Sequence, residues 1–295
     1  MRPVTLPHRN GVSPSFVALP AACSGNLLAF LAQRFPAIDS NTWVARMERG
    51  DMLDDRGSVM TPDTPCRPHA KICYYRELAV ETRIPFEEAI LHVDDHLLVV
   101  DKPHFLPVTP SGRFLQETLL VRLRQKTGLA DLTPIHRLDR ETAGVMLFSH
   151  NPATRGLYQS LFQQRAVAKV YEALAGVLDG VQFPLTYRSR MVDGTPFFRM
   201  QEVQGEANSE TVITPLEQRG EHVLYLLKPV TGRKHQLRLH MASLGIPILN
   251  DAFYPDALPC KADDMSSPLK LLARSIGFTD PLSGARRHFA SLRWL

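Results

Sequence analysis

The feature that most constrains this chain is the run HRLDRETAG at residues 136–144, which leads directly into the apolar segment VMLF at 145–148. One carboxylate, Asp139, lies between two arginines, Arg137 and Arg140. Nearby positive charge favours the ionised form of a carboxylate, and a carboxylate held in a turn beside a strand can act as a nucleophile or a base. A local salt bridge or a turn cap is the plainer role for such an aspartate. The chain must therefore build a charged turn against a buried strand.

A second pattern lies at residues 167–174, VAKVYEAL, where β-branched and apolar residues predict a strand. The period of two along a strand places Lys169 and Tyr171 on one face. A tyrosine on a strand is by default a packing or rim residue, and exposed lysines on strands are common. This pattern therefore indicates function only in combination with others.

The third pattern is TGRKHQLRLH at residues 231–240. Leu237, Met241 and Leu244 follow at helical spacing, which predicts a helix from about 232 to 245. The first turn of such a helix offers backbone N–H groups and the positive end of the helix dipole, and both favour an anion. A solvated charged face is the alternative. The basic side chains near this helix start are Arg233, Lys234, His235 and Arg238.

In this order, the three patterns resemble the motifs of the RluA-like family of RNA pseudouridine synthases: H-R-L-D-x-x-T-S-G, K-x-Y-x-A and G-R-T-H-Q-L-R-x-H. Ala143 stands where the family has Ser, and Lys234 where it has Thr. The resemblance covers residues 86–290. It implies isomerisation of a uridine within RNA, in which the glycosidic bond is broken, the base is turned and a new bond is made through carbon 5. It implies no cofactor and no metal.

The resemblance also implies roles for single residues. Asp139 attacks the ribose or otherwise promotes departure of the base, two routes that the sequence does not separate. Tyr171 assists removal of the proton from carbon 5, and Arg238 pairs with Asp139, which leaves Arg140 as a local neighbour. Arg137 fills the place that the flipped uridine leaves. The motif residues expected to contact the substrate are His136, Arg137, Lys169, Arg233, Lys234, His235, Gln236 and Leu237.

The 295 residues, 44% of them hydrophobic, suffice for a sizeable core. Predicted strands outnumber helices without regular alternation, which favours an α+β fold with a mainly antiparallel sheet. The resemblance refines this to the pseudouridine synthase fold, a bent, mixed, mainly antiparallel sheet with flanking helices, in a catalytic domain at 86–295. Amphipathic spacing predicts one helix that ends at Gly128 and another over 152–165. The second is expected to bury Leu157, Leu161 and Phe162.

Residues 1–24 are rich in proline and small polar residues and are expected to form an irregular arm. In 25–80, two helical patterns precede short extended pieces, an order that resembles the alpha-L RNA-binding module of this family. Arginines there would contact phosphates, whereas aspartates dilute the charge, so a degenerate module that only packs is the alternative. The arginines are Arg34, Arg46, Arg49 and Arg56, and the aspartates are Asp51, Asp54 and Asp55.

A net charge of +4 and a pI of about 8.9 are compatible with a polyanionic partner without requiring one. We expect ribosomal or transfer RNA as that partner, and a monomer as the default. Four scattered cysteines fit reduced thiols in the cytoplasm, and no apolar run approaches the ~20 residues of a membrane span. The spacing of Cys66, His69 and Cys73 does not fit a zinc site.

The main alternative is a non-catalytic RNA-binding relative that acts in RNA folding or ribosome assembly. The joint presence of Asp139, Tyr171 and Arg238 disfavours it. A phosphotransferase is weaker still, because the HRLD run differs in spacing from the kinase H-R-D loop and neither a Gly-rich phosphate loop nor D-F-G occurs. The sequence therefore predicts an RNA pseudouridine synthase.

Overall fold

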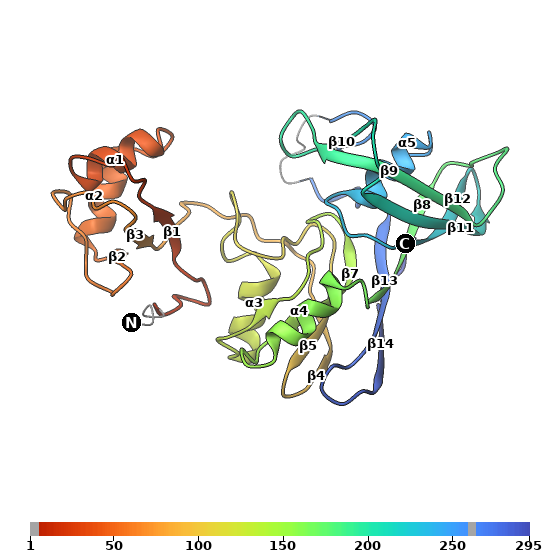
Figure 1. Ribbon diagram of the computed structural model, residues 1–295, viewed down its shortest axis with the longest axis horizontal. Helices are drawn as coiled ribbons and strands as arrows, with labels where there is room; N and C mark the ends of the chain where they lie inside the picture. The colour runs from red at the N-terminus through yellow and green to blue at the C-terminus, as the bar shows by residue number, and fades with distance from the viewer. Residues whose placement is uncertain (1–5, 259–263) are drawn as a thin grey trace. The chain divides into compact units, whose positions relative to one another are not determined.

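The structure is a computed structural model that describes residues 6–258 and 264–295. The chain divides into two compact units: unit 1 is Met1–Glu81 with Pro110–Gln116, and unit 2 is Thr82–Thr109 with Glu117–Leu295. Figure 1 shows the helices and strands of each unit. All three sequence motifs lie in unit 2.

Unit 1 contains a three-stranded antiparallel sheet in the order β1-β3-β2, and two helices. Both helices begin at a side-chain cap: Asn26 accepts a hydrogen bond from the Ala29 N–H at 2.9 Å, and Asp39 accepts one from the Asn41 N–H at 2.7 Å. Trp43 is fully buried in the core of this unit. The elements are β1 (Ser15–Ala18), α1 (Leu27–Arg34), α2 (Ser40–Glu48), β2 (Met52–Asp54) and β3 (Lys71–Tyr74).

Strand β1 differs from the expected irregular arm over residues 1–24. Ser15 pairs opposite Tyr74, and Ala18 opposite Lys71. Strand hydrogen bonds need a partner, and this partner lies far along the chain. A local pattern therefore carries no signal for β1.

Unit 2 contains an eleven-stranded sheet with the path β10-β9-β11-β12-β8-β13-β7-β5-β4, to which β14 adds beside β13 and β6 beside β7. Within the described residues, β7 and β13 form the one parallel pair, and the other pairs are antiparallel. This confirms the predicted α+β class with a mixed, mainly antiparallel sheet. The strands are β4 (Ala89–Val93), β5 (Leu97–Lys102), β6 (Thr133–Pro134), β7 (Ala143–Ser149), β8 (Ala168–Ala175), β9 (Leu185–Asp193), β10 (Met200–Val203), β11 (Ser209–Arg219), β12 (His222–Pro229), β13 (Leu271–Thr279) and β14 (Arg286–Ala290).

Helix α3 (Leu119–Thr127) ends, as predicted, at Gly128, which adopts a left-handed conformation. Helix α4 (Arg155–Gln163) buries Tyr158 completely and leaves Leu157 46% exposed, which corrects the expectation that Leu157 is buried. The third helix of the unit is α5 (Gln236–Ser243). No helix among the described residues is long and apolar enough to cross a membrane.

Among the described residues of unit 2, two large hydrophobic clusters lie one in each half of the sheet, and a smaller cluster contains Met191, Met200, Leu239 and Tyr254. One large cluster joins α5 to β8, β11 and β12, and the other joins α4 to β5 and β7, while β13 contributes to both. Figure 1 shows α4 beside the half with β4, β5 and β7, and α5 beside the other half. The boundary between the halves therefore lies along β8, β13 and β7, where the three motifs converge.

At this boundary the chain requires a glycine. Gly144, the first motif's last residue, has φ +116°, and a Cβ atom there would lie 2.2 Å from the backbone oxygen of Ala273 on β13. The two residues are paired in the parallel ladder. No other residue tolerates both the backbone conformation and the contact. This close approach brings the end of the Asp139 loop against β13.

Candidate active site

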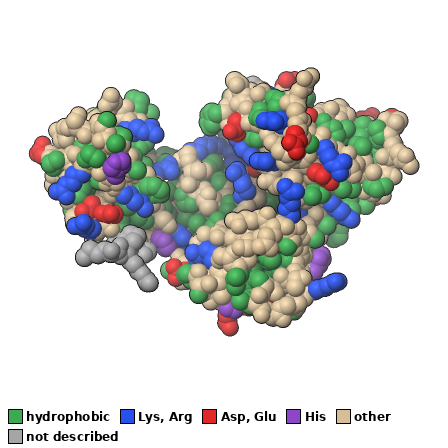
Figure 2. Space-filling model, viewed as in Figure 1, with side chains coloured by type: hydrophobic (Ala, Val, Ile, Leu, Met, Phe, Trp, Pro, Cys, Tyr) green, Lys and Arg blue, Asp and Glu red, His purple; other side chains and the backbone are tan. Residues whose placement is uncertain are grey.

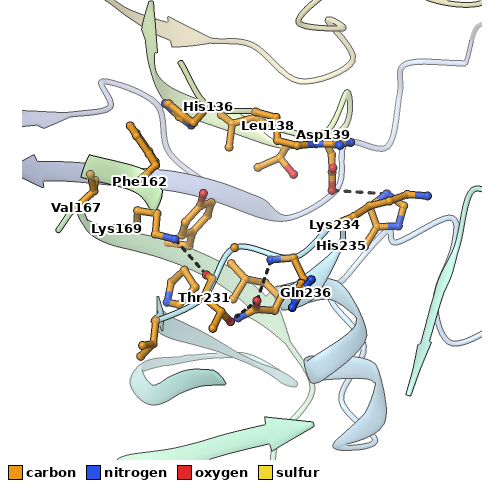
Figure 3. A pocket seen from close by; sticks show the side chains of 18 of the residues that line it. His136, Leu138, Asp139, Phe162, Val167, Lys169, Thr231, Lys234, His235 and Gln236 are labelled. Atoms are coloured by element: carbon orange, nitrogen blue, oxygen red, sulfur yellow. Dashed lines mark hydrogen bonds and ion pairs between the residues drawn. The ribbon is translucent and has the colours of Figure 1, made fainter. Parts of the chain in front are cut away.

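A pocket of about 460 Å³ lies where the three motifs meet. It is lined by the loop before β7, by β8, and by the segment from the end of β12 into α5. All eleven site residues expected from the sequence line this one pocket: His136, Arg137, Asp139, Lys169, Tyr171, Arg233, Lys234, His235, Gln236, Leu237 and Arg238. Figure 3 shows the Asp139 carboxylate facing His235, with Lys169 reaching towards the Thr231 backbone.

Arg238 is the cation nearest to Asp139. Its Nη1 lies 3.6 Å from Asp139 Oδ2, and its side chain is 1% exposed. Nη1 has no hydrogen-bond partner among the described residues. The distance is that of an ion pair without a formed hydrogen bond. The pairing expected from the sequence is therefore present as a charge contact, with a donor of Arg238 still available to Asp139.

Asp251 contributes to this site, although the sequence analysis assigned it no role there. The Arg238 Nε and Nη2 atoms donate to its two carboxylate oxygens at 2.8 and 2.6 Å. The same carboxylate accepts the Phe253 N–H at 2.8 Å. Although burial opposes it, this hydrogen bonding raises the pKa of Arg238. Asp251 follows Ile248-Leu249-Asn250, and the sequence alone does not show that its carboxylate pairs with Arg238.

His235 closes the pocket beside Asp139. It precedes α5 in a left-handed conformation, with φ +53°. Its Nε2 lies 3.8 Å from Asp139 Oδ2, and its Nδ1 lies 3.0 Å from the Tyr254 hydroxyl. Burial lowers the pKa of His235 to about 4. The ring is therefore neutral near pH 7, which leaves Arg238 as the positive partner of Asp139.

Tyr171 points into the pocket from the middle of β8. Leu227 of β12 flanks it on one side and Ala273 of β13 on the other. Burial, and then the negative charge of Asp139, raise the pKa of the Tyr171 hydroxyl. Tyr171 is thus a neutral phenol at physiological pH rather than a phenolate.

Two of the residues expected to contact the substrate are bound to groups of the protein itself. Lys169 Nζ donates to the Thr231 carbonyl at 3.1 Å, and burial lowers the pKa of Lys169. Gln236 accepts from the Thr231 hydroxyl at 2.6 Å and from the Arg233 N–H at 3.0 Å, and donates to the Glu210 carbonyl at 2.9 Å. These contacts hold the loop before α5 in place.

Contacts with the protein itself also hold His136 in place. Its Nε2 accepts the Leu147 N–H of β7 at 2.9 Å, and its ring stacks on Phe162 of α4 with centroids 4.8 Å apart. Burial lowers the pKa of His136 to about 3, so the ring is neutral and remains an acceptor. His136 thereby ties the Asp139 loop to the strand that follows it.

The Asp139 loop rests on a buried lysine. Lys102 Nζ donates to the carbonyls of Pro103, Leu106 and Arg140 at 3.0, 2.8 and 3.0 Å. Burial lowers the pKa of Lys102 to about 7, against the opposing charges of Glu141 and Asp139. Arg140 itself donates to the Phe105 carbonyl at 3.1 Å and lies 3.5 Å from Glu141.

The rim of the pocket is basic. Arg137 and Arg233 are exposed, and Lys234 is half-buried. On the face of unit 2 that Figure 2 displays, Lys and Arg side chains gather about the hollow between its upper and lower parts. Such a border suits a phosphate backbone. The described residues contain no group of three or more His, Cys, Asp or Glu side chains placed to hold a metal ion.

Comparison with known proteins gives one consistent family. A family model described as RNA pseudouridylate synthase matches residues 96–243. The chain is 29% identical over 239 residues to an uncharacterised RNA pseudouridine synthase of Synechocystis sp.. The matched region covers 79% of this chain and 81% of that protein. It is 33% identical over 208 residues to the dual-specificity RNA pseudouridine synthase RluA of Haemophilus influenzae, covering 68% and 90% of the two chains.

A solved structure shows the same fold. Human RNA Pseudouridylate Synthase Domain Containing 1 is similar with a TM-score of 0.58 at 23% identity, over 72% of this chain and 86% of that one. Together with the three motifs that meet in one pocket, these similarities identify the chain as a member of the RluA-like family of RNA pseudouridine synthases, and therefore as an RNA-modifying isomerase.

Proposed function

We propose that this protein converts uridines in ribosomal or transfer RNA to pseudouridine, with Asp139 as the catalytic carboxylate. The observation that carries the proposal is the placement of Asp139 in a pocket, 3.6 Å from a buried guanidinium nitrogen that has no hydrogen-bond partner among the described residues. Opposite charges at this distance attract each other. The pocket thus presents one anionic group to the sugar and base of a bound nucleotide.

The reaction conserves the atoms of the nucleotide. The bond between N1 and C1′ breaks, the base turns, and a bond between C5 and C1′ forms; C5 then loses a proton and N1 gains one. Asp139 serves at C1′, either as nucleophile or by stabilising departure of the base. Arg238 and Asp251 act as positioning residues, because they direct the charge that faces Asp139.

Tyr171 is proposed to move the proton from C5. Its hydroxyl is protonated in the free protein because burial and Asp139 raise its pKa. It therefore acts as a relay that receives the proton from C5 while its own proton goes to N1, rather than as a standing base. A relay of this kind needs no cofactor or metal.

A uridine stacked inside RNA must be flipped out to reach this pocket. Arg137 is exposed on the same loop as Asp139 and is proposed to fill the vacated place. Arg233 and Lys234 at the opposite rim are proposed to contact phosphates. We propose residues 86–295 as the catalytic domain.

Residues 25–80 in unit 1 are proposed to bind RNA through fewer arginines than the sequence suggests. Arg46 is 6% exposed and lies over the Trp43 ring at 4.9 Å. Arg49 pairs with Asp51 at 2.9 Å and with Glu77 at 2.7 Å. The proposal therefore rests on Arg34 and Arg56, which are both exposed.

We further propose that the protein acts as a monomer in the cytoplasm. The three described cysteines, Cys23, Cys66 and Cys73, are free thiols, which fits a reducing compartment. Sedimentation of the purified full chain tests the first statement, since a dimer would contradict it. Fractionation of the source cells tests the second.

The decisive experiment compares pseudouridine maps of RNA from cells with and without this protein, followed by single-turnover assays on a transcript of a mapped site. Asp139→Asn should abolish product while the unfolding midpoint stays near that of the wild type. Asp179→Asn, a change of the same kind at an exposed position, should retain full activity. Product formation by Asp139→Asn would overturn the assignment. Absence of product with the wild-type protein on every RNA would instead favour the non-catalytic relative.

A further inference from the structure

An aromatic ring stands exposed beside this active site. Phe197 lies in the turn between β9 and β10 and is 86% exposed. Scattered apolar side chains on a surface are ordinary. Phe197 differs because its backbone is held by a residue that lines the pocket: Lys234 Nζ donates to the Phe197 carbonyl at 3.2 Å.

The turn that carries Phe197 is well anchored. The Gly194 N–H donates to the Arg199 carbonyl at 3.1 Å, and the Arg199 N–H to the Pro196 carbonyl at 2.9 Å. At the start of β10, the Met200 N–H donates to the Tyr254 hydroxyl at 2.8 Å. The exposed ring is thus presented on a fixed backbone, at low further entropic cost for binding.

A row of rings connects Phe197 with the pocket. Phe197 packs edge-on against Phe198 with centroids 5.7 Å apart, and Phe198 lies 5.1 Å from Phe253. Phe253 lies 5.6 Å from the ring of His235, whose Nε2 is 3.8 Å from Asp139. Phe198 and Phe253 are partly buried. The outermost ring, Phe197, is therefore exposed while its neighbours support it.

The charge around the row fits a nucleic acid. Lys234 binds the turn itself, Arg233 next to it in the chain is exposed, and the Arg199 guanidinium lies over the Tyr254 ring at 5.0 Å. Cationic side chains that alternate with aromatic rings are typical of surfaces on which unpaired bases stack while their phosphates are neutralised. A uridine that flips into the pocket also unstacks from its neighbours, so a flanking base can stack elsewhere.

We propose that Phe197 is a stacking platform for the base of a nucleotide that flanks the target uridine. The proposal rests on the proposed function, since it places the flanking nucleotide relative to a uridine bound at Asp139. Every base has a flat face on which an aromatic ring can stack. Phe197 therefore adds affinity and fixes the position of the RNA strand, but it does not select one base over another. It acts on binding, and it does not touch the reacting atoms.

The first test is kinetic, on a transcript of a site mapped with the wild-type protein. Phe197→Ala should raise KM about tenfold, equivalent to about 1.4 kcal/mol, and leave the single-turnover rate at saturating RNA and the unfolding midpoint unchanged. Phe197→Trp, which keeps an aromatic ring at this position, should have a KM close to that of the wild type. Leu216→Ala, the matched control at an exposed apolar position on β11, should change neither. A KM for Phe197→Ala within twofold of the wild type would overturn the proposal.

The second test locates the stacked base. Transcripts that carry one abasic nucleotide at successive positions around the target should include one position at which the wild type and Phe197→Ala bind equally. If the difference between them persists at every position, base stacking is wrong. If the variant instead changes only the sedimentation of the protein, Phe197 is a contact between protein copies and the proposal fails.

A binding measurement separates this proposal from the proposed function. In an Asp139→Asn background, the fluorescence of Phe197→Trp should be quenched by a uridine-rich single-stranded oligonucleotide, relative to the same background without the tryptophan. Quenching supports the platform even if no pseudouridine forms on any RNA. Without quenching the platform is refuted, whatever the activity of the wild type.

Discussion

Arg238 donates two hydrogen bonds to the Asp251 carboxylate, at 2.8 and 2.6 Å, while its remaining terminal nitrogen lies 3.6 Å from Asp139. The Arg238 and Asp251 side chains are both almost completely buried, each 1% exposed. The fork therefore has one orientation, which aims Nη1 at the Asp139 carboxylate. A single guanidinium thus contacts both the Asp251 and the Asp139 carboxylates.

Asp251→Asn should impair catalysis although residue 251 does not contact the substrate. Loss of the charge leaves Arg238 buried with a weaker partner, a change that costs up to ~3–5 kcal/mol when a buried pair is broken. We expect a smaller loss of stability for this near-isosteric change and a fall in the single-turnover rate with KM little altered. Urea unfolding and single-turnover assays measure both. An unchanged rate would show that Asp139 does not depend on this orientation.

Arg238→Lys should be far more damaging than Arg140→Lys. Lysine cannot form the two-pronged contact with Asp251 and also face Asp139. We expect a loss of about 10²-fold or more in rate, as for removal of an oriented charge-stabilising donor. Arg140 donates to a backbone carbonyl and lies 3.5 Å from Glu141, so its lysine variant should stay within a few-fold of the wild type. Equal tolerance at both positions would contradict the assignment.

Stability should fall on acidification, in part through His240. Burial lowers the pKa of His240 to about 4 in the folded protein, against about 6.5 when unfolded. Between these values the unfolded state binds more protons, so this contribution is complete above about pH 6.5 and is lost as the pH falls towards 4. It amounts to roughly 3 kcal/mol at most.

His240→Gln should therefore show a shallower loss of stability between about pH 6.5 and 4.5. His288→Gln, at an exposed position, is the control and should follow the wild type. Denaturant unfolding at several pH values measures the slopes. Parallel curves for all three proteins would exclude His240 as a source of the acid sensitivity.

Gly144→Ala should prevent normal folding of unit 2. The added methyl group would meet the Ala273 carbonyl oxygen at 2.2 Å, at a backbone φ of +116°. The clash and the conformational strain together should cost about 3 kcal/mol or more. Gly156→Ala, in helix α4 with no atom within 4 Å of the new methyl group, should be neutral or slightly stabilising. Thermal unfolding of the two variants provides the comparison.

The site illustrates which parts of a catalytic pocket are visible in a sequence. The eleven residues taken from three separated motifs all line one cavity. Their individual contacts were not predictable. Lys169 and Gln236 bind the Thr231 region of the chain itself, which depends on how a loop folds back on β8.

The sequence by itself determined the chemistry, the α+β class, the end of α3 at Gly128, and the presence of Asp139, Tyr171 and Arg238. These follow from residue type and short-range periodicity. The tertiary structure alone decided that Asp251 orients Arg238, that Ser15–Ala18 form a strand, and that Phe197 is exposed beside Lys234. The physical reason is that hydrogen-bond partners and burial are settled by residues far apart in the chain, which no local pattern records.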